Sequence, residues 1–176
     1  MTTTTARQKI HVCKIVDSPV GRLTLVASDS GLAAILWEND DPLRVRLNIV
    51  GEDDNHPVLV EAARQLREYF AGDRKTFALT LDFAGTEFQR KVWQALLTIP
   101  FGETRSYAQI ARQIGSPSAV RAVGAANGKN PVSIVAPCHR VIGSSGELTG
   151  FAGGLEAKAI LLELEGARTR PLKLAV

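Results

Sequence analysis

The sequence predicts an α/β protein of the α+β type, in which a small N-terminal domain of antiparallel sheet plus helix precedes a mostly helical C-terminal domain. Short apolar segments separated by turn residues fill the first 40 positions, and helical apolar spacing with capping motifs begins after Gly85. With 176 residues and 45% hydrophobic side chains, the chain suits one compact domain or two small ones that share a core. We expect domains at residues 1–83 and 86–170.

The N-terminal domain should contain an antiparallel meander and one long helix. Strands are expected at 10–16, 23–27 and 32–37. The acidic stretch that follows is broken by proline and glycine and predicts only a short helix at 42–49. Apolar residues at helical spacing predict a helix over 58–71, and residues 77–83 return to an extended pattern.

Capping motifs mark the helices of the C-terminal domain. A Ser or Thr followed three residues later by Gln, at 86–89 and again at 106–109, predicts a helix start at each place. Ser116 is expected to cap a third helix that runs to about Asn127. The second and third helices, joined by a glycine-containing turn, predict a helix-turn-helix. A last helix is expected over 155–165.

A reactive cysteine is the main chemical candidate. Cys138 is one of two cysteines and lies in Pro-Cys-His-Arg, directly after the apolar run 132–136, which has the composition of a buried strand. His139 supplies a proton acceptor and Arg140 a positive charge, and nearby positive charge lowers a thiol pKa from about 8.5 toward the nucleophilic thiolate. From these four residues alone, a Cys that serves only as a small hydrophobe remains an alternative.

The charge distribution favours an anionic partner. The net charge is +3, but residues 86–140 carry seven Lys and Arg against two Glu, whereas residues 1–85 carry ten against twelve acidic residues. A basic region around the reactive cysteine is typical of nucleic-acid binding. A solvated basic face explains the charge equally well.

The third helix of the C-terminal domain is unusual because Arg121 is its only long polar side chain. Ala119, Ala122 and Ala126 would let the helix backbone approach a narrow groove closely while Arg121 enters the base stack. Tight packing of these small residues on neighbouring helices is the alternative.

Several classes of protein are disfavoured. No apolar stretch approaches the roughly 20 residues that span a bilayer, and residues 1–9 lack the apolar centre of a secretion signal, so we expect a cytoplasmic protein without a membrane partner. His11, Cys13 and His56 are spread apart without a Cys-x-x-Cys pair, so we expect no metal and no cofactor.

The motifs around Cys138 resemble one family. PCHRVIG, preceded by AVGAANGKNPVSIVA and followed by GSSGELTGFAGG and LLELEG, is similar to the methylated-DNA–protein-cysteine methyltransferases, the alkylguanine-DNA alkyltransferases of direct repair. The resemblance is specific over about residues 88–166 and general in layout before them. It implies irreversible transfer of a methyl or larger alkyl group from 6-O-alkylguanine, flipped out of duplex DNA, to Cys138. Each molecule then reacts once. Activity on 4-O-methylthymine stays open.

The resemblance also assigns roles in the reaction. His139 would act on the thiol through a bridging water, and Glu165 would orient the imidazole. Tyr107 would give a proton to the leaving guanine, and Asn130 would support the active-site turn.

Further roles implied by the resemblance concern DNA. Arg121 would hold open the gap left by the flipped base in the minor groove. The base pocket would be lined by Val141, Gly150, Phe151 and Ala152, and phosphate contacts would come from Ser116 and Ser144. The protein is expected to act as a monomer, and cooperative assembly on DNA stays open.

Two other functions remain as rivals. A cysteine hydrolase needs a His that is distant in sequence from the nucleophile, and only His11 and His56 remain for that role. A regulator that senses lesions without repairing them would bind DNA with no covalent change, but it would not need Cys138.

Overall fold

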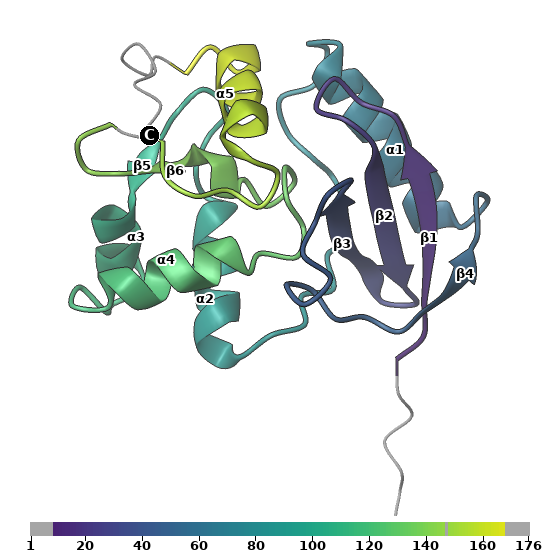
Figure 1. Cartoon of the computed structure of the whole chain (residues 1–176), viewed down its shortest axis with the longest axis horizontal. Helices are drawn as coiled ribbons and strands as arrows, with labels where there is room; N and C mark the ends of the chain where they lie inside the picture. Colours follow the sequence, from purple (N-terminus) through teal and green to yellow (C-terminus); the bar gives the residue numbers. More distant parts are fainter. Residues whose placement is uncertain (1–8, 147, 168–176) are drawn as a thin grey trace, which may run out of the picture.

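The computed structural model describes residues 9–146 and 148–167; the last three positions of the predicted C-terminal domain, 168–170, lie outside them. Strands β1 (His11–Val16), β2 (Leu23–Ser28) and β3 (Gly31–Trp37) form the predicted antiparallel meander. Helix α1 (Pro57–Phe70) packs on this sheet (Figure 1). The expected N-terminal combination of sheet and helix is therefore confirmed.

A fourth strand makes the sheet mixed rather than purely antiparallel. β4 (Ile49–Glu52) pairs in parallel with β1, which gives the order β3-β2-β1-β4. The predicted helix at 42–49 is wrong, because residues 42–48 form turns and irregular structure. Backbone hydrogen bonds to β1 hold this edge, including one from the His11 amide to the Asn48 carbonyl at 3.0 Å. All four residues of β4 are exposed, so no apolar pattern could have indicated the strand.

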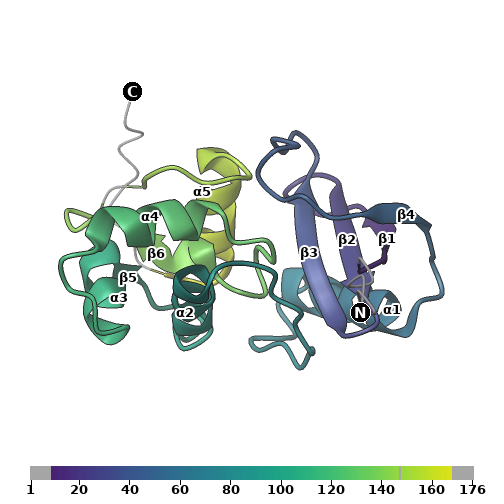
Figure 2. The ribbon, with the colours of Figure 1, turned by 90° about the horizontal axis from the view of Figure 1, so that it is seen from below.

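The C-terminal part is helical, as expected. It comprises α2 (Glu87–Leu96), β5 (Arg105–Ser106), α3 (Tyr107–Gln113), α4 (Val120–Gly128), the 3₁₀ turn η1 (Cys138–Arg140), β6 (Val141–Ile142) and α5 (Leu155–Leu164). Both predicted capping boxes are present, since the side chains of Thr86 and Ser106 accept from the backbone amides of Gln89 and Gln109. Helices α2, α3 and α4 pack against one another (Figure 2).

Helix α4 begins later than the sequence predicted. Ser116 does not cap it; its carbonyl instead accepts from the Ala119 amide at 2.9 Å in a turn, and Ala119 is the N-cap residue without a side-chain hydrogen bond. The turn consumes the positions that the prediction assigned to the first helical turn. Ser116 therefore lies in the connection between α3 and α4.

The two parts of the chain share buried surface. Val132, Ile134 and Val135 of the C-terminal part are buried in the same apolar cluster as Leu59 and Leu66 of α1. A second cluster lies within the C-terminal part and contains Cys138. The segment that leads to the reactive cysteine is thus held by the N-terminal sheet and helix. Within the described residues, no helix has the length and apolar content to cross a bilayer.

Candidate active site

The residues before Cys138 form a turn rather than the predicted buried strand. Only Val132 makes a strand-like contact, with Ile35 of β3, and the chain then reverses with a bond from the Ala136 amide to the Val132 carbonyl at 2.9 Å. Asn130 closes the turn: its Nδ2 donates to the Ala136 carbonyl at 2.8 Å, and its Oδ1 accepts from the Val132 amide at 3.1 Å. Because a buried side chain satisfies these backbone groups, the apolar run does not need a sheet partner.

Ile134 adopts a left-handed backbone conformation in this turn, with φ of 74°. A β-branched residue in that region is strained, typically by about 1–3 kcal/mol. Burial of its side chain in the shared apolar cluster offsets the strain. The turn delivers Cys138 to the first position of η1, one residue before His139.

His139 and Glu165 form a buried pair beside the cysteine. His139 Nε2 lies 2.8 Å from Glu165 Oε2, and both side chains are inaccessible to solvent. Burial opposes ionisation of Glu165, but hydrogen bonds from His139 and Arg140 and their charges outweigh it and hold its pKa at about 2. An ionised carboxylate only accepts, so Nε2 carries the ring proton. Burial lowers the pKa of His139, which keeps Nδ1 as an acceptor, and Nδ1 makes no hydrogen bond to a described protein atom.

Arg140 binds the carboxylate and does not supply the charge near sulfur that the sequence suggested. Its Nε donates to Glu165 Oε1 at 2.7 Å and its Nη2 to Oε2 at 3.0 Å, while Nη1 donates to the Ile99 carbonyl at 2.6 Å. The guanidinium is thus committed to positioning Glu165.

Among the charged groups, Lys158 contributes most to stabilising a thiolate at Cys138, and the sequence analysis missed it. Cys138 is 3% exposed, and burial raises the pKa of its thiol; Asn130, Lys158, Arg44 and Ser133 oppose that rise. The expected net lowering of the thiol pKa is therefore wrong. Lys158 is fully buried on α5, donates to the Val141 and Thr149 carbonyls at 2.7 and 3.1 Å, and has its pKa lowered by burial to about 8. A Lys one turn before the buried pair Leu161 and Leu162 was the available signal.

Tyr107 and two of the pocket residues gather around the cysteine. Tyr107 and Phe151 are partly buried against the cluster that contains Cys138 and Val141. The Tyr107 hydroxyl lies 2.6 Å from Thr149 Oγ1. Gly150 is exposed and Ala152 half-buried, and both lie with Phe151 in the loop that leads into α5. Tyr107, Phe151 and Val141 thus share the apolar cluster of Cys138, whereas Gly150 and Ala152 are placed only as chain neighbours of Phe151.

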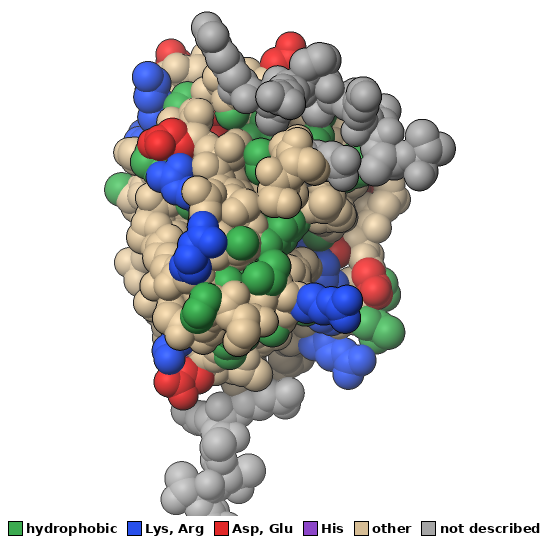
Figure 3. Space-filling model, turned by 90° about the vertical axis from the view of Figure 1, so that its left-hand side faces the viewer, with side chains coloured by type: hydrophobic (Ala, Val, Ile, Leu, Met, Phe, Trp, Pro, Cys, Tyr) green, Lys and Arg blue, Asp and Glu red, His purple; other side chains and the backbone are tan. Residues whose placement is uncertain are grey.

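The other residues predicted to contact DNA lie on α4 and in the loops around it, and one of them is buried. Arg121 and Ala122 are exposed, Ala119 is half-exposed, and Ser144 is exposed in the loop after β6. Ala126 is 3% exposed and packs in the C-terminal core, so it does not belong to the exposed face of α4. Figure 3 views the α3–α4 end of the molecule and shows basic side chains spread around exposed apolar ones.

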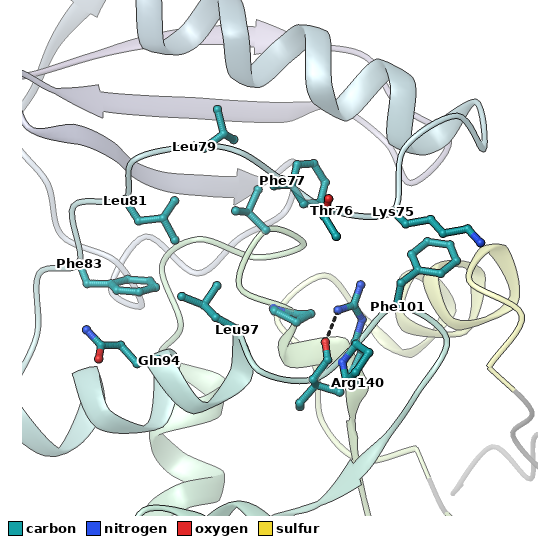
Figure 4. Close-up of a pocket in the computed structure, with 14 residues that line it drawn as sticks. Lys75, Thr76, Phe77, Leu79, Leu81, Phe83, Gln94, Leu97, Phe101 and Arg140 are labelled. Carbon is teal, nitrogen blue, oxygen red and sulfur yellow. Dashed lines mark hydrogen bonds between the residues drawn. The ribbon is translucent and has the colours of Figure 1, made fainter.

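A cavity of about 620 Å³ lies between the two parts of the chain, on another side of the active-site turn (Figure 4). Phe77, Leu79 and Leu81, near the end of the N-terminal domain, line it together with Phe101 and Arg140. Cys138 does not line this cavity, so it is not the expected base pocket.

The remaining histidines are occupied elsewhere. The His56 side chain accepts from the Val58 amide at the start of α1, and His11 is buried on β1. The site next to Cys138 therefore depends on His139, which disfavours the hydrolase alternative. Cys13 is buried with Val26 and Ala34 in a separate small cluster.

Comparisons with known proteins match both parts of the chain. A family model described as 6-O-methylguanine DNA methyltransferase, DNA binding domain, matches residues 87–167, and one described as the ribonuclease-like domain of the same methyltransferase matches residues 11–83. The methylated-DNA–protein-cysteine methyltransferase of Mycobacterium leprae is 52% identical over 158 residues, covering 89% of this chain and 92% of the relative. The constitutive Bacillus subtilis protein of that name is 48% identical over 151 residues, with 85% and 92% covered.

Solved structures match over nearly the whole chain. Mycobacterium tuberculosis OGT in complex with DNA aligns with a TM-score of 0.79 at 47% identity, over 92% of this chain and 96% of that one. The O6-methylguanine methyltransferase of the same organism aligns with a TM-score of 0.78 at 48% identity, with the same coverage.

Proposed function

The chain belongs to the family of methylated-DNA–protein-cysteine methyltransferases, transferases of direct DNA repair, and we propose that Cys138 is the cysteine that accepts the alkyl group from 6-O-alkylguanine in DNA. The observation that carries this assignment is the buried hydrogen bond between His139 Nε2 and Glu165, directly beside Cys138. It leaves Nδ1 of a neutral imidazole as an acceptor next to a thiol.

The proposed reaction is a displacement at carbon. The sulfur of Cys138 forms a bond to the alkyl carbon while the bond from that carbon to guanine O6 breaks, and its electron pair stays with the base. His139 Nδ1 takes the thiol proton through a bridging water, and Tyr107 gives a proton to a ring nitrogen of the leaving guanine. The thiol loses one proton to His139, and the leaving guanine gains one from Tyr107. His139 is left protonated and Tyr107 deprotonated, so atoms and charge balance. A thioether has no base-labile bond, so each molecule reacts once.

Burial of Cys138 requires that the base come to the sulfur. Flipping a base out of the stack costs a few kcal/mol, and less for a weakened pair. We assign the exposed face of α4 to the minor groove, where Ala122 allows a close approach and Arg121 fills the vacated place in the stack. Helices α3 and α4 would act together as the helix-turn-helix, and one chain would act as a monomer.

Supporting roles are proposed for the remaining positions. Asn130 holds the active-site turn, through its bonds to Ala136 and Val132. Phe151, Val141, Gly150 and Ala152 wall the base pocket, and Ser144 and Ser116 contact phosphates. We assign residues up to 83 to the N-terminal domain and those from 86 onward to the DNA-binding domain.

Intact-protein mass spectrometry tests the proposal. After incubation with duplex DNA that contains 6-O-methylguanine, the protein should gain the mass of one methyl group, once, on Cys138. Cys138→Ser should gain nothing and still bind DNA, whereas Cys13→Ser, the matched control, should react like the unmodified protein. Methylation of Cys138→Ser, or repeated turnover by the unmodified protein, would remove Cys138 from this role.

A further inference from the structure

The catalytic carboxylate is held from the N-terminal domain as well as from its own. Tyr69, on the last turn of α1, is fully buried, and its hydroxyl donates to Glu165 Oε2 at 2.7 Å. The same oxygen faces His139 Nε2 at 2.8 Å. The two residues joined by the tyrosine bond are 96 positions apart in the chain.

The position of this hydroxyl is fixed by its surroundings. The ring centroid of Tyr69 lies 5.2 Å from that of Phe70, 5.3 Å from that of Phe77 and 6.2 Å from that of Phe101. A ring packed on three sides has little freedom to carry its hydroxyl away from Glu165. Tyr69 itself stays protonated, because burial and the neighbouring carboxylate raise the pKa of its hydroxyl.

We propose that Tyr69 is a positioning residue of the alkyl-transfer site, which sets the basicity of His139 through Glu165 and so makes the N-terminal domain part of the reacting machinery. The inference rests on the proposed function, because it concerns the same relay. It extends that function by giving a residue of the N-terminal domain a share in the proton transfer.

One carboxylate oxygen, Glu165 Oε2, links the phenol of Tyr69 to the imidazole of His139. A hydrogen bond to the charged form of a carboxylate stabilises that form and lowers its basicity. Glu165 Oε2 accepts from Tyr69 and from His139. A stronger hydrogen bond from the phenol therefore makes this oxygen a weaker acceptor for the imidazole N–H. The charged groups that face the pair are Arg140 on η1 and Lys158 on α5, and neither changes when the phenol is altered.

The rate of transfer depends on the protonation state of His139. His139 acts as the base only when it is neutral, so the rate of transfer falls on the acid side as His139 becomes protonated. Loss of the phenol bond makes Glu165 a stronger partner for the protonated imidazole, and this raises the pKa of His139. The acid limb of the rate profile should therefore move to higher pH.

The experiment measures single-turnover transfer to the full-length protein from free 6-O-methylguanine, over a range of pH, so that DNA binding does not contribute. Unmodified protein must first gain one methyl group on Cys138; if it does not, the proposed function itself fails. With that established, the acid limb of Tyr69→Phe should lie about 0.5–1 pH unit higher than that of the unmodified protein.

Two controls separate this role from simple packing. Phe77→Leu removes an aromatic contact of the Tyr69 ring and keeps the hydroxyl, so it should lower thermal stability without moving the acid limb. Replacing tyrosine by 3-fluorotyrosine in Tyr107→Phe protein strengthens the donor at Tyr69 alone, and the limb should move to lower pH. The second control needs no change of the buried shape and answers the question even if Tyr69→Phe is unstable.

The outcomes are distinct. An unmoved limb in Tyr69→Phe, or a limb that moves equally in Phe77→Leu, overturns the inference while leaving Cys138 as the acceptor. So does a fluorinated protein whose limb stays where it was.

Discussion

Replacing Lys158 by Met should separate the stability of the fold from the reactivity of the thiol. Lys158 is fully buried on α5, and burial lowers the pKa of its ammonium from the ordinary 10.5 to about 8. That difference corresponds to about 3 kcal/mol, which folding spends on burying the charge at neutral pH. Methionine has a similar length and carries no charge, so the substitution removes this cost.

The pH dependence of the free energy of unfolding measures the cost of burying the Lys158 charge most directly. Between pH 8 and 10.5 the unfolded chain keeps the Lys158 proton that the folded chain has released, so the unfolded state binds more protons and stability rises with pH. The unmodified protein should therefore gain about 3 kcal/mol relative to Lys158→Met across this window. At pH 7 the stabilities of the unmodified protein and of Lys158→Met should be closer. The variant avoids burying a charge, but it leaves the Val141 and Thr149 carbonyls without a donor, which costs about 1–3 kcal/mol.

The substitution relieves the cost of a buried charge, but it should lower the reactivity of the Cys138 thiol. Lys158 opposes the rise in the pKa of Cys138, so the variant should raise that pKa further, and alkylation by iodoacetamide should be slower with its midpoint at higher pH. Urea unfolding at several pH values and thiol alkylation rates measure both effects. Lys91→Met, on the exposed surface of α2, removes the same formal charge and should change neither. A stability difference that is flat from pH 7 to 10.5, or unchanged alkylation, would refute the reasoning.

Two further predictions concern the DNA face and the leaving group. Arg121→Ala should slow transfer from duplex DNA at least tenfold and leave reaction with free 6-O-methylguanine nearly unchanged, because the side chain is exposed on α4 and its proposed role concerns only the base stack; equal losses on both substrates in single-turnover assays would contradict the wedge. Tyr107→Phe should lower the transfer rate about 10²-fold, the low end for general acid catalysis, while DNA affinity in a binding titration stays within a few-fold. The reverse pattern would assign Tyr107 to binding.

Local signals predicted the elements that depend on local contacts. The capping boxes at Thr86 and Ser106 predicted two helix starts correctly, because each is closed by a side chain three residues away. The predictions failed where the local structure depends on a partner outside the segment itself. β4 exists because β1 offers a free edge, and residues 132–136 turn because Asn130 closes the loop around them.

Sequence signals likewise predicted only some of the residues of the candidate site. The motif around Cys138 and the resemblance gave His139 and Glu165, which the structure brings to 2.8 Å. Lys158 and Tyr69 carry no motif, since one is a single Lys in an apolar helix and the other an ordinary aromatic in α1. Their importance depends on contacts with Cys138 and Glu165 that only the folded chain creates.

Burial at this site is compatible with reactivity because compensating charges are already in place. Burial alone disfavours the thiolate of Cys138 and the protonated form of His139, so proton transfer between them should be unfavourable in an apolar cluster. Each product of that transfer, however, finds an opposite charge that the fold holds beforehand: Lys158 for the thiolate and Glu165 for the imidazolium. The transfer therefore gives the charge of Lys158 an anionic partner and adds the imidazolium to the ion pair that Arg140 already makes with Glu165. A site built in this way can keep its thiol protonated at rest and form the thiolate when the flipped guanine lies within reach of the sulfur.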